Sequence, residues 1–292
     1  MKMDYSLREW VGLARIHTSI AEAAVTVQAR ESGTTTEAVR ATMAHHLHCM
    51  QDAVKNGLEE NLRSVTGLTG GQAAMLLARL HGGKCLCGSL LGKAETYALA
   101  TAECNACMGK IVAAPTAGAC GILPGAILAM MEDRGVTEEE AVNALFVAAA
   151  VGQSIAMQAS ISGAEGGCQA ECGAGAAMAA AALTYLEGGT AQQCADAAAF
   201  ALMNLLGLVC DPVGGLVEVP CVYRNVGSSG VAFTAADMVL SGICCPIDPD
   251  EVILAMKEVG DAMPPTLRET GEGGCAACDS IRERLKIIQE RI

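Results

Sequence analysis

Three cysteines stand at breaks between apolar segments, where a thiol can act as a ligand rather than as a core filler. Cys168 follows the turn sequence GAEGG, and Cys210 and Cys221 bracket a segment that contains two glycines and two prolines. A thiol that only fills a core falls more often within an apolar run. A thiol at a rigid loop corner, where backbone N–H groups point at sulfur, suits a metal ion or an iron–sulfur cluster. We therefore take these three residues as candidate ligands of one metal centre.

A second group of metal-binding residue types lies in one predicted helix. His45, His46, His48 and Cys49 have the i, i+4 spacing that places two zinc ligands on one helix face. His46 points to another face, however, and no second ligand pair stands nearby in the sequence. An ordinary, partly exposed helix face is the better interpretation.

Two more cysteine arrangements compete with the first three. Cys104 and Cys107 form a C-x-x-C pair, but a redox motif of that kind needs a βαβ setting that the sequence does not indicate. These two thiols are therefore expected to share a packed helix face. Cys172 lies one turn after Cys168 and is the local rival for a ligand position, although it also begins a predicted buried helix.

The composition predicts a globular chain of close-packed helices. Of the 292 residues 52% are hydrophobic, 17% charged and only 3% aromatic, and Ala, Val, Leu and Met dominate the apolar content. The net charge of −13 argues against nucleic acid or an acidic membrane surface as a partner. The longest apolar run, 141–159, carries polar interruptions and predicts a buried helix rather than a membrane span.

The cysteine count and the N-terminus predict where the protein works. Fifteen cysteines in a short secreted protein would indicate a disulfide scaffold. Here the chain is long, the number is odd and the N-terminus shows no signal peptide. We therefore expect reduced thiols and a cytoplasmic protein.

Helical periodicity predicts one all-α domain over residues 1–292, with about ten helices and an N-terminal helix pair within 1–60 as part of it. Helix starts are indicated by capping boxes at 34–37 and 137–140, by Thr190, and by Asp248 followed by Pro249. The expected helices cover 7–29, 37–61, 72–80, 90–113, 123–132, 141–159, 173–186, 190–206, 231–240, 248–263 and 279–292.

Glycine-rich loops precede several of these helices. A helix N-terminus presents free backbone N–H groups and suits an anion such as a carboxylate. Such loops stand at 66–71, at 114–121 and at 225–230, the last being expected to precede a helix over 231–240. A flexible connector is the alternative for each loop. If the loops converge, they build a polar pocket within an apolar bundle.

Seven motifs resemble the alpha chain of the iron–sulfur-dependent L-serine dehydratase family, in register over about residues 60–275. They are TGLTGG at 66–71, APTAG at 114–118, SISGA at 160–164, GGCQAE at 166–171, GLVCDPV at 207–213, GLVEVPC at 215–221 and LRETG at 267–271. The resemblance implies a [4Fe–4S] cluster held by Cys168, Cys210 and Cys221 with one open iron. It also implies β-elimination of L-serine to pyruvate and ammonia. A separate beta chain is implied as partner, because only two helices precede the matching region.

The chemistry implied by the resemblance needs a Lewis acid for the serine hydroxyl, a base for the α-proton and a site for the carboxylate. The catalytic candidates are Thr116, Lys84 and Glu171, and the base can also belong to the beta chain. Arg268 is a candidate for bidentate pairing with the carboxylate. The full set of substrate-binding candidates is Thr66, Gly70, Thr116, Gly118, Asn225, Ser228 and Arg268.

Five further cysteines stand where the family usually has Ser, Ala or Leu. Some single-chain members end in a cysteine that reaches the open iron, and Cys275 or Cys278 is a candidate for the same place here. The five are Cys85, Cys87, Cys120, Cys275 and Cys278.

Two other functions compete with this one. A pyridoxal-phosphate serine dehydratase would use Lys84 for the Schiff base, but it needs an α/β fold with a phosphate loop. A non-catalytic iron–sulfur protein for electron transfer or redox sensing prefers four protein ligands and no open iron.

Overall fold

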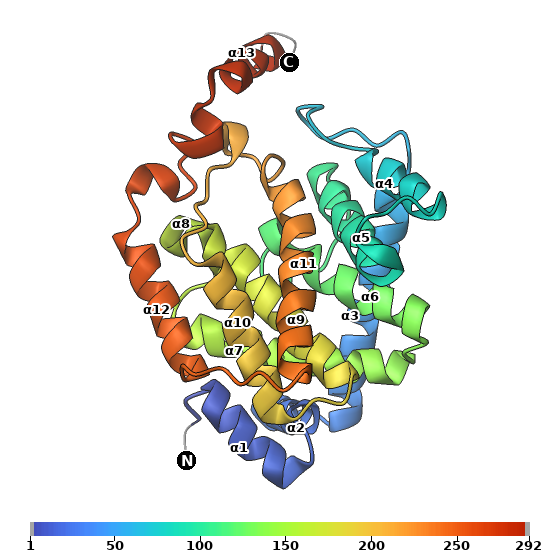
Figure 1. Cartoon of the computed structure of the whole chain (residues 1–292), viewed down its shortest axis with the longest axis vertical. Coiled ribbons are helices and arrows are strands. Elements are labelled where there is room, and N and C mark those ends of the chain that lie inside the picture. Colours follow the sequence, from blue (N-terminus) through green and yellow to red (C-terminus); the bar gives the residue numbers. More distant parts are fainter. Residues whose placement is uncertain (1–2, 290–292) are drawn as a thin grey trace.

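An alanine-rich helix, α9 (Ala174–Leu186), forms the centre of the molecule, and its residues from Ala174 to Thr184 are all buried. Small side chains allow neighbouring helix axes to approach closely. Four helices pack around α9 (Figure 1): α6 (Ile122–Arg134), α7 (Glu138–Gln158), α10 (Ala191–Leu205) and α11 (Cys221–Leu240).

The computed structural model describes residues 3–289, and over this range the chain forms thirteen α-helices and no β-strand. The all-α prediction is confirmed. The helices not yet given are α1 (Leu7–His17), α2 (Ile20–Ser32), α3 (Thr36–Gly57), α4 (Gln72–His81), α5 (Gly88–Ala106), α8 (Gly163–Gly166), α12 (Pro249–Ala262) and α13 (Asp279–Gln289). The chain end beyond 289, which the last predicted helix includes, lies outside the described residues.

The helix predicted over 7–29 is wrong as a single element, because the chain breaks between α1 and α2. Thr18 takes a left-handed conformation with φ of 72°. Ser19 then caps α2, and its side chain accepts a hydrogen bond from the Glu22 N–H. A cap of this kind stops one helix and starts the next, which periodicity alone does not reveal.

Most of the predicted helix starts are confirmed. Thr137 forms a capping box with Glu140, and Thr190 forms one with Gln193. Asp248 caps α12, with Pro249 in the first helical position. The box predicted at 34–37 is displaced by one residue, because Thr35 is the cap and accepts from the Ala38 N–H.

The segment 225–230 is not a loop before a helix, and this prediction is wrong. α11 begins at Cys221 and runs through the segment without a break. Asn225, Ser228 and Ser229 are buried on its packed face, and Ser229 Oγ donates to the Asn225 carbonyl at 3.0 Å. Tertiary packing of this face overrides the weak helix propensity of two glycines and three polar residues. A helix N-terminus for binding an anion is therefore absent from this segment.

Two glycines of neighbouring elements pack directly against the backbone of helix α5. A larger residue at either position would require the backbone to shift. A Cβ at Gly57 of α3 would lie 1.8 Å from the Ala100 carbonyl oxygen. A Cβ at Gly121, before α6, would lie 2.2 Å from the Ala98 carbonyl oxygen. The α3–α5–α6 layer is thus set by backbone contact rather than by side-chain interdigitation.

Helix α7 is long and apolar enough to cross a membrane by length and composition. Its most apolar window is 67% buried within the protein, and α7 packs on α9 and α2. This burial is that of a core helix.

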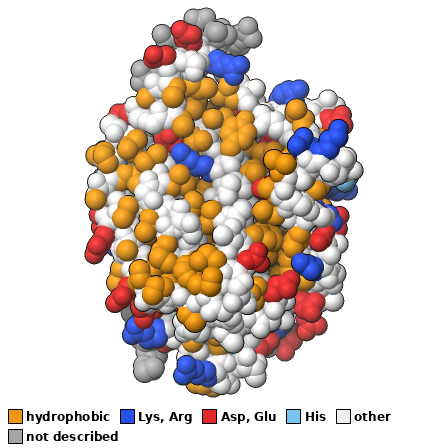
Figure 2. All heavy atoms as spheres, viewed as in Figure 1, with side chains coloured by type: hydrophobic (Ala, Val, Ile, Leu, Met, Phe, Trp, Pro, Cys, Tyr) orange, Lys and Arg blue, Asp and Glu red, His pale blue; other side chains and the backbone are white. Residues whose placement is uncertain are grey.

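Helices α1 and α13 lie at opposite ends of the molecule (Figure 1). α13 projects from the body and, among the described elements, packs chiefly on the short turn Gly274–Ala277. On the face shown in Figure 2, hydrophobic side chains gather over the middle, and many of the acidic side chains lie towards the edge.

We predict that Gly57→Ala lowers the free energy of unfolding by about 1–3 kcal/mol, because the added methyl overpacks the contact with α5. The matched control is Gly12→Ala on α1, where a Cβ meets nothing within 4 Å. This control should raise stability by about 0.5–1 kcal/mol, because alanine costs less chain entropy. Urea unfolding followed by circular dichroism measures both. Equal effects in the two variants would contradict the backbone-contact interpretation.

Candidate metal centre and active site

Three chain segments bring Cys168, Cys210 and Cys221 together in the interior. Cys168 follows α8, Cys210 lies in the connection after α10, and Cys221 is the first residue of α11. All three are buried, and all fifteen cysteines of the chain are free thiols. The three thiols lie near enough to act on one another: after burial and the Glu171 charge, the charges of Cys168 and Cys221 also raise the pKa of Cys210.

Gln169 fixes the corner that presents Cys168. Its backbone N–H donates to the Leu208 carbonyl at 2.9 Å, and its side-chain Oε1 accepts from the Gly207 N–H at 2.9 Å. Its Nε2 donates to the Met256 carbonyl on α12 at 2.8 Å. One buried amide therefore joins the Cys168 corner to the Cys210 connection and to α12. Gln169 is not among the residues predicted from the sequence, and its position next to a predicted ligand is the signal that points to it.

The Cys210 backbone pairs with the segment around Arg268. The Cys210 N–H donates to the Leu267 carbonyl at 2.9 Å, and the Glu269 N–H donates to the Cys210 carbonyl at 2.7 Å. The two segments form a single parallel bridge. The motif at 267–271 thus lies beside the Cys210 corner, as the idea of converging loops requires.

Asn225 joins the Cys221 end of α11 to the loop over 116–121. Its Oδ1 accepts from the Gly121 N–H at 2.8 Å, and its Nδ2 donates to the carbonyls of Gly118 and Cys221 at 2.8 and 2.9 Å. The side chain is buried, and both its oxygen and its nitrogen are engaged in these bonds. Asn225 therefore positions the loop, and substrate contact by Asn225 stays a prediction.

Glu171 lies at the meeting point of these segments. The Thr116 hydroxyl donates to its Oε1 at 2.6 Å, and Cys210 Sγ donates to its Oε2 over 3.9 Å. A Cβ at Gly118 would lie 2.9 Å from Oε1, and one at Gly163 would lie 2.7 Å from Oε2. Two glycine backbones therefore enclose the carboxylate, and burial raises its pKa above the usual range.

The pKa is raised for three of the four thiols at this site, Cys172, Cys210 and Cys221. Burial, followed by the charges of Cys168 and Glu171, raises the pKa of Cys221 to about 12. The pKa of Cys172 is well above its usual value because its thiol is hydrogen-bonded to Cys168 and buried. That same hydrogen bond, helped by the Arg224 charge, lowers the pKa of Cys168. Metal binding at this site must therefore release protons from Cys210 and Cys221.

The donor set fits an iron–sulfur cluster, because cysteine thiolates are the usual ligands of such a group. Within residues 3–289 no three side chains of His, Cys, Asp and Glu stand close enough to share one metal ion. The histidines of α3 show no such convergence: His45 Nε2 lies 3.6 Å from Cys49 Sγ, and His48 faces Glu138.

The loop over 66–71 binds two carboxylates of the protein itself. Thr69 Oγ1 and the N–H groups of Gly70, Gln72 and Ala73 donate to the buried Glu103 over 2.8–3.1 Å. The Thr66 N–H and hydroxyl donate to Glu218. This loop attracts an anion, as predicted, but internal carboxylates occupy these donors. Substrate contact by Thr66 and Gly70 stays a prediction.

The other candidate residues lie in different surroundings. Arg268 lines a cavity of about 360 Å3 with Lys257 and Asp261, and its Nη1 donates to the Glu165 carbonyl at 3.5 Å. Ser228 is buried within α11. Lys84 is exposed in the connection between α4 and α5, and no contact described for this chain brings it to the Thr116–Glu171 pair.

Comparison with known proteins decides the family. The family model for the serine dehydratase alpha chain matches residues 16–276. The chain belongs to the serine dehydratase alpha-chain family. It is 51% identical over 254 residues to the probable L-serine dehydratase alpha chain of Bacillus subtilis, covering 87% of this chain and 84% of the relative. It is 42% identical over 247 residues to the L-serine dehydratase alpha chain of Peptoniphilus asaccharolyticus, with 85% of each chain covered.

Other members of the serine dehydratase family are longer. L-serine dehydratase 2 of Escherichia coli is 46% identical over 190 residues, which cover 63% of this chain and 42% of that relative. The match to relatives called alpha chains therefore spans most of their length, whereas the match to this relative spans less than half. The motifs quoted above all fall within the residues that match the family model.

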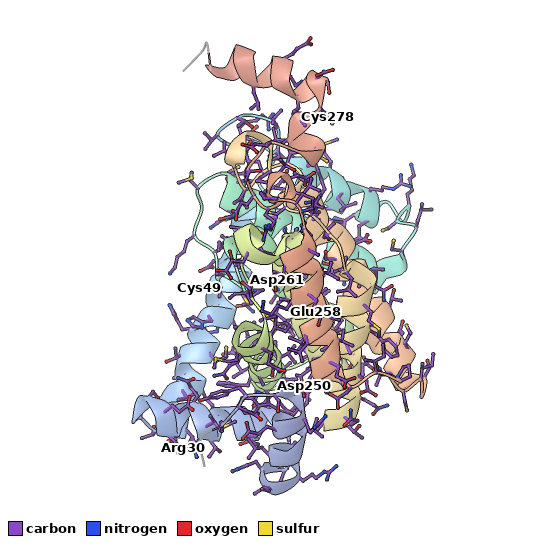
Figure 3. The ribbon with its side chains drawn as sticks, turned by 90° about the vertical axis from the view of Figure 1, so that its left-hand side faces the viewer. Arg30, Cys49, Asp250, Glu258, Asp261 and Cys278 are labelled. Carbon is purple, nitrogen blue, oxygen red and sulfur yellow. The ribbon has the colours of Figure 1, made fainter. Side chains whose placement is uncertain are left out.

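The additional cysteines of this serine dehydratase alpha chain lie in two kinds of place. The Cys275 N–H donates to Asp211 Oδ2 at 2.6 Å, next to Cys210, and its thiol is exposed. Cys278 is exposed at the base of α13 (Figure 3). Cys120 is buried and its pKa is raised by burial to about 12, whereas Cys85 and Cys87 lie near the surface. An approach of Cys275 or Cys278 to an open iron stays a prediction.

We predict that Asn225→Ala lowers the free energy of unfolding by about 1–3 kcal/mol, because the buried Gly121 N–H loses its acceptor. Asn105→Ala is the control, since Asn105 makes one bond near the surface, to the Ala117 carbonyl at 3.2 Å. Its effect should stay within about 0.5 kcal/mol. Both are measured by urea unfolding of the metal-free protein, and a neutral Asn225 variant would contradict the positioning role.

Proposed function

We propose that this chain is the catalytic subunit of an L-serine dehydratase, which converts L-serine to pyruvate and ammonia. The observation that carries the proposal is the convergence of three buried thiols beside the Thr116–Glu171 pair. The relatives that match along most of their length are named as L-serine dehydratase alpha chains, which supports the same substrate.

Cys168, Cys210 and Cys221 would hold a [4Fe–4S] cluster with one iron that has no protein ligand. When bound, the cluster supplies a Lewis acid for the serine hydroxyl, which is otherwise a poor leaving group. The buried position of the three thiols keeps bulk water from the site.

Glu171 is the base that the contacts favour. It removes the α-proton of serine, the C–H electron pair forms the Cα–Cβ double bond, and the β-hydroxyl leaves as water after gaining a proton. The aminoacrylate product tautomerises to an imine, which water hydrolyses to pyruvate and ammonia. The Thr116 hydroxyl holds one carboxylate oxygen of Glu171 and leaves the other directed towards Cys210.

The loop over 116–121 and Arg268 are proposed to bind the serine carboxylate. Gly118 lies against Glu171, so a substrate held by this loop would place its α-carbon near the base. Arg268 is paired through its backbone with Cys210, and its fork of N–H donors matches a carboxylate. Lys84 has no part in this arrangement.

A separate beta chain is proposed as the partner of this subunit. Relatives called alpha chains match over 84% and 85% of their length, whereas the longer relative described above matches over only 42%. The longer relative therefore carries a further region that a second chain would supply here. Fifteen free thiols support a reducing, cytoplasmic location for the complex.

A second candidate function rests on Cys172. This thiol is buried and its pKa is raised by its neighbour Cys168, and four cysteines at a cluster are typical of an electron-transfer protein. If Cys172 were the fourth ligand, Cys172→Ser would change the cluster spectrum and L-serine would not. In a dehydratase, adding L-serine changes the spectrum and Cys172→Ser keeps activity.

We predict that Cys168→Ala, Cys210→Ala and Cys221→Ala each lose the cluster and lower serine deamination to background. The control is Cys194→Ala, since Cys194 is buried on α10 and belongs to none of the segments that form the site. The experiment is anaerobic reconstitution with iron and sulfide, with and without a beta chain, followed by iron analysis and a pyruvate assay. Full activity in any of the three ligand variants would overturn the proposal.

We predict that Glu171→Gln lowers kcat by about 10²–10⁴-fold, because the amide cannot accept the α-proton. The Gln side chain still accepts a hydrogen bond from Thr116, so the cluster should load as in the parent. Lys84→Met serves as the control and should leave kcat unchanged. An unchanged kcat in Glu171→Gln would exclude Glu171 and direct attention to the beta chain.

A further inference from the structure

Arg224 lies on α11 one turn after Cys221, on the side of the helix that faces the cysteine site. Residues at i and i+3 share a helix face, so its position is tied to that of Cys221. Only 17% of its side chain is exposed. A buried guanidinium needs partners, and those of Arg224 all belong to the candidate metal centre.

The guanidinium holds both neighbours of Cys210. Nη1 donates to the Val209 carbonyl at 2.7 Å, and Nη2 lies 2.8 Å from Asp211 Oδ1. Asp211 Oδ1 makes no aligned hydrogen bond, so this second contact is an ion pair. Arg224 therefore secures the Cys210 corner against α11 from both sides.

Asp211 extends the link to the C-terminal segment. The carboxylate is buried, and its Oδ2 accepts from the Cys275 N–H at 2.6 Å. A Cβ at Gly274, whose φ is +58°, would lie 2.2 Å from the same oxygen. The backbone at 274–275 therefore packs directly against the Asp211 carboxylate. Arg224 supplies the positive charge that neutralises this carboxylate.

We propose that Arg224 is the positioning residue of the three-cysteine site, setting the place of the Cys210 corner and supplying the charge that offsets the thiolates. The inference rests on the proposed function, in which Cys168, Cys210 and Cys221 hold a cluster. Three thiolates give such a site negative charge, and hydrogen bonds and charges around the sulfurs set its retention and potential. Arg224 is tied to Cys221 by one helical turn and to Cys210 through the two residues that flank it.

The test compares Arg224→Met, Arg224→Lys and Arg40→Met after anaerobic reconstitution. Arg40 is the control, because it is a half-buried arginine paired with Glu22 and Asn143, both on helices outside the site. We expect Arg224→Met to lose iron to a chelator about 10–100-fold faster than the parent. Arg224→Lys keeps the positive charge but loses the forked pair of N–H donors. Its rate of iron loss should therefore lie between those of the parent and of Arg224→Met. Arg40→Met should match the parent.

The midpoint potential separates a positioning charge from a general loss of stability. Removal of a positive charge disfavours reduction, so the clusters retained in Arg224→Met should have a more negative potential than those of the parent. Arg224→Lys and Arg40→Met should stay near the parent value. Parent-like potential and iron loss in Arg224→Met would overturn the inference.

A double variant covers the case in which Arg224→Met does not fold because Asp211 is left unpaired. In Asp211→Asn/Arg224→Met no buried charge remains without a partner, so this variant should fold and still lose iron rapidly. Iron retention equal to the parent would overturn the inference. A parent protein that takes up no cluster would instead overturn the proposed function, and the two failures are therefore distinct.

Discussion

The cost of holding several buried thiols close together is the constraint on which the rest of this structure depends. Burial and neighbouring charge raise the pKa of Cys210 and Cys221, so neither ionises without a metal or a cation. Each thiol stands at a corner whose backbone is held by other residues, and Arg224 supplies a positive charge beside them. Binding of the proposed cluster would therefore have to displace the protons of Cys210 and Cys221.

Buried carboxylates hold the loops around this site. Glu103 accepts four hydrogen bonds, two from the loop before α4 and two from the first residues of α4, and Glu218, three residues before Cys221, binds Ser64 and Thr66. The N–H and hydroxyl donors of this glycine-rich loop thus bind carboxylates of the protein itself, which stabilises the fold. The consequence is that a glycine-rich loop near an active site is not by itself a substrate site.

The sequence alone predicts the all-α fold and the capping boxes, because those features depend on neighbours within four residues. Cys168, Cys210 and Cys221 could be selected because each stands at a break in an apolar pattern. Their convergence is a long-range property. The Ser64–Glu218 bond joins residues 154 apart, and the Gly121–Asn225 bond joins residues 104 apart. No local pattern shows such pairs, which is why Asn225 was assigned to a loop and Gln169 was overlooked.

Close helix packing explains how the candidate base is kept in place. Gly121 touches the backbone of α5, which fixes the loop that carries Thr116 and Gly118. Gly118 and Gly163 then confine Glu171 from two sides, so its position depends on backbone atoms rather than on flexible side chains. Because the same carboxylate reaches towards Cys210, the distance from base to metal centre is set by the α5–α6 contact and by the α11 helix that carries Cys221 and Asn225. The alanine- and glycine-rich composition therefore sets the position of Glu171, because larger side chains at these contacts would move its carboxylate away from the thiols.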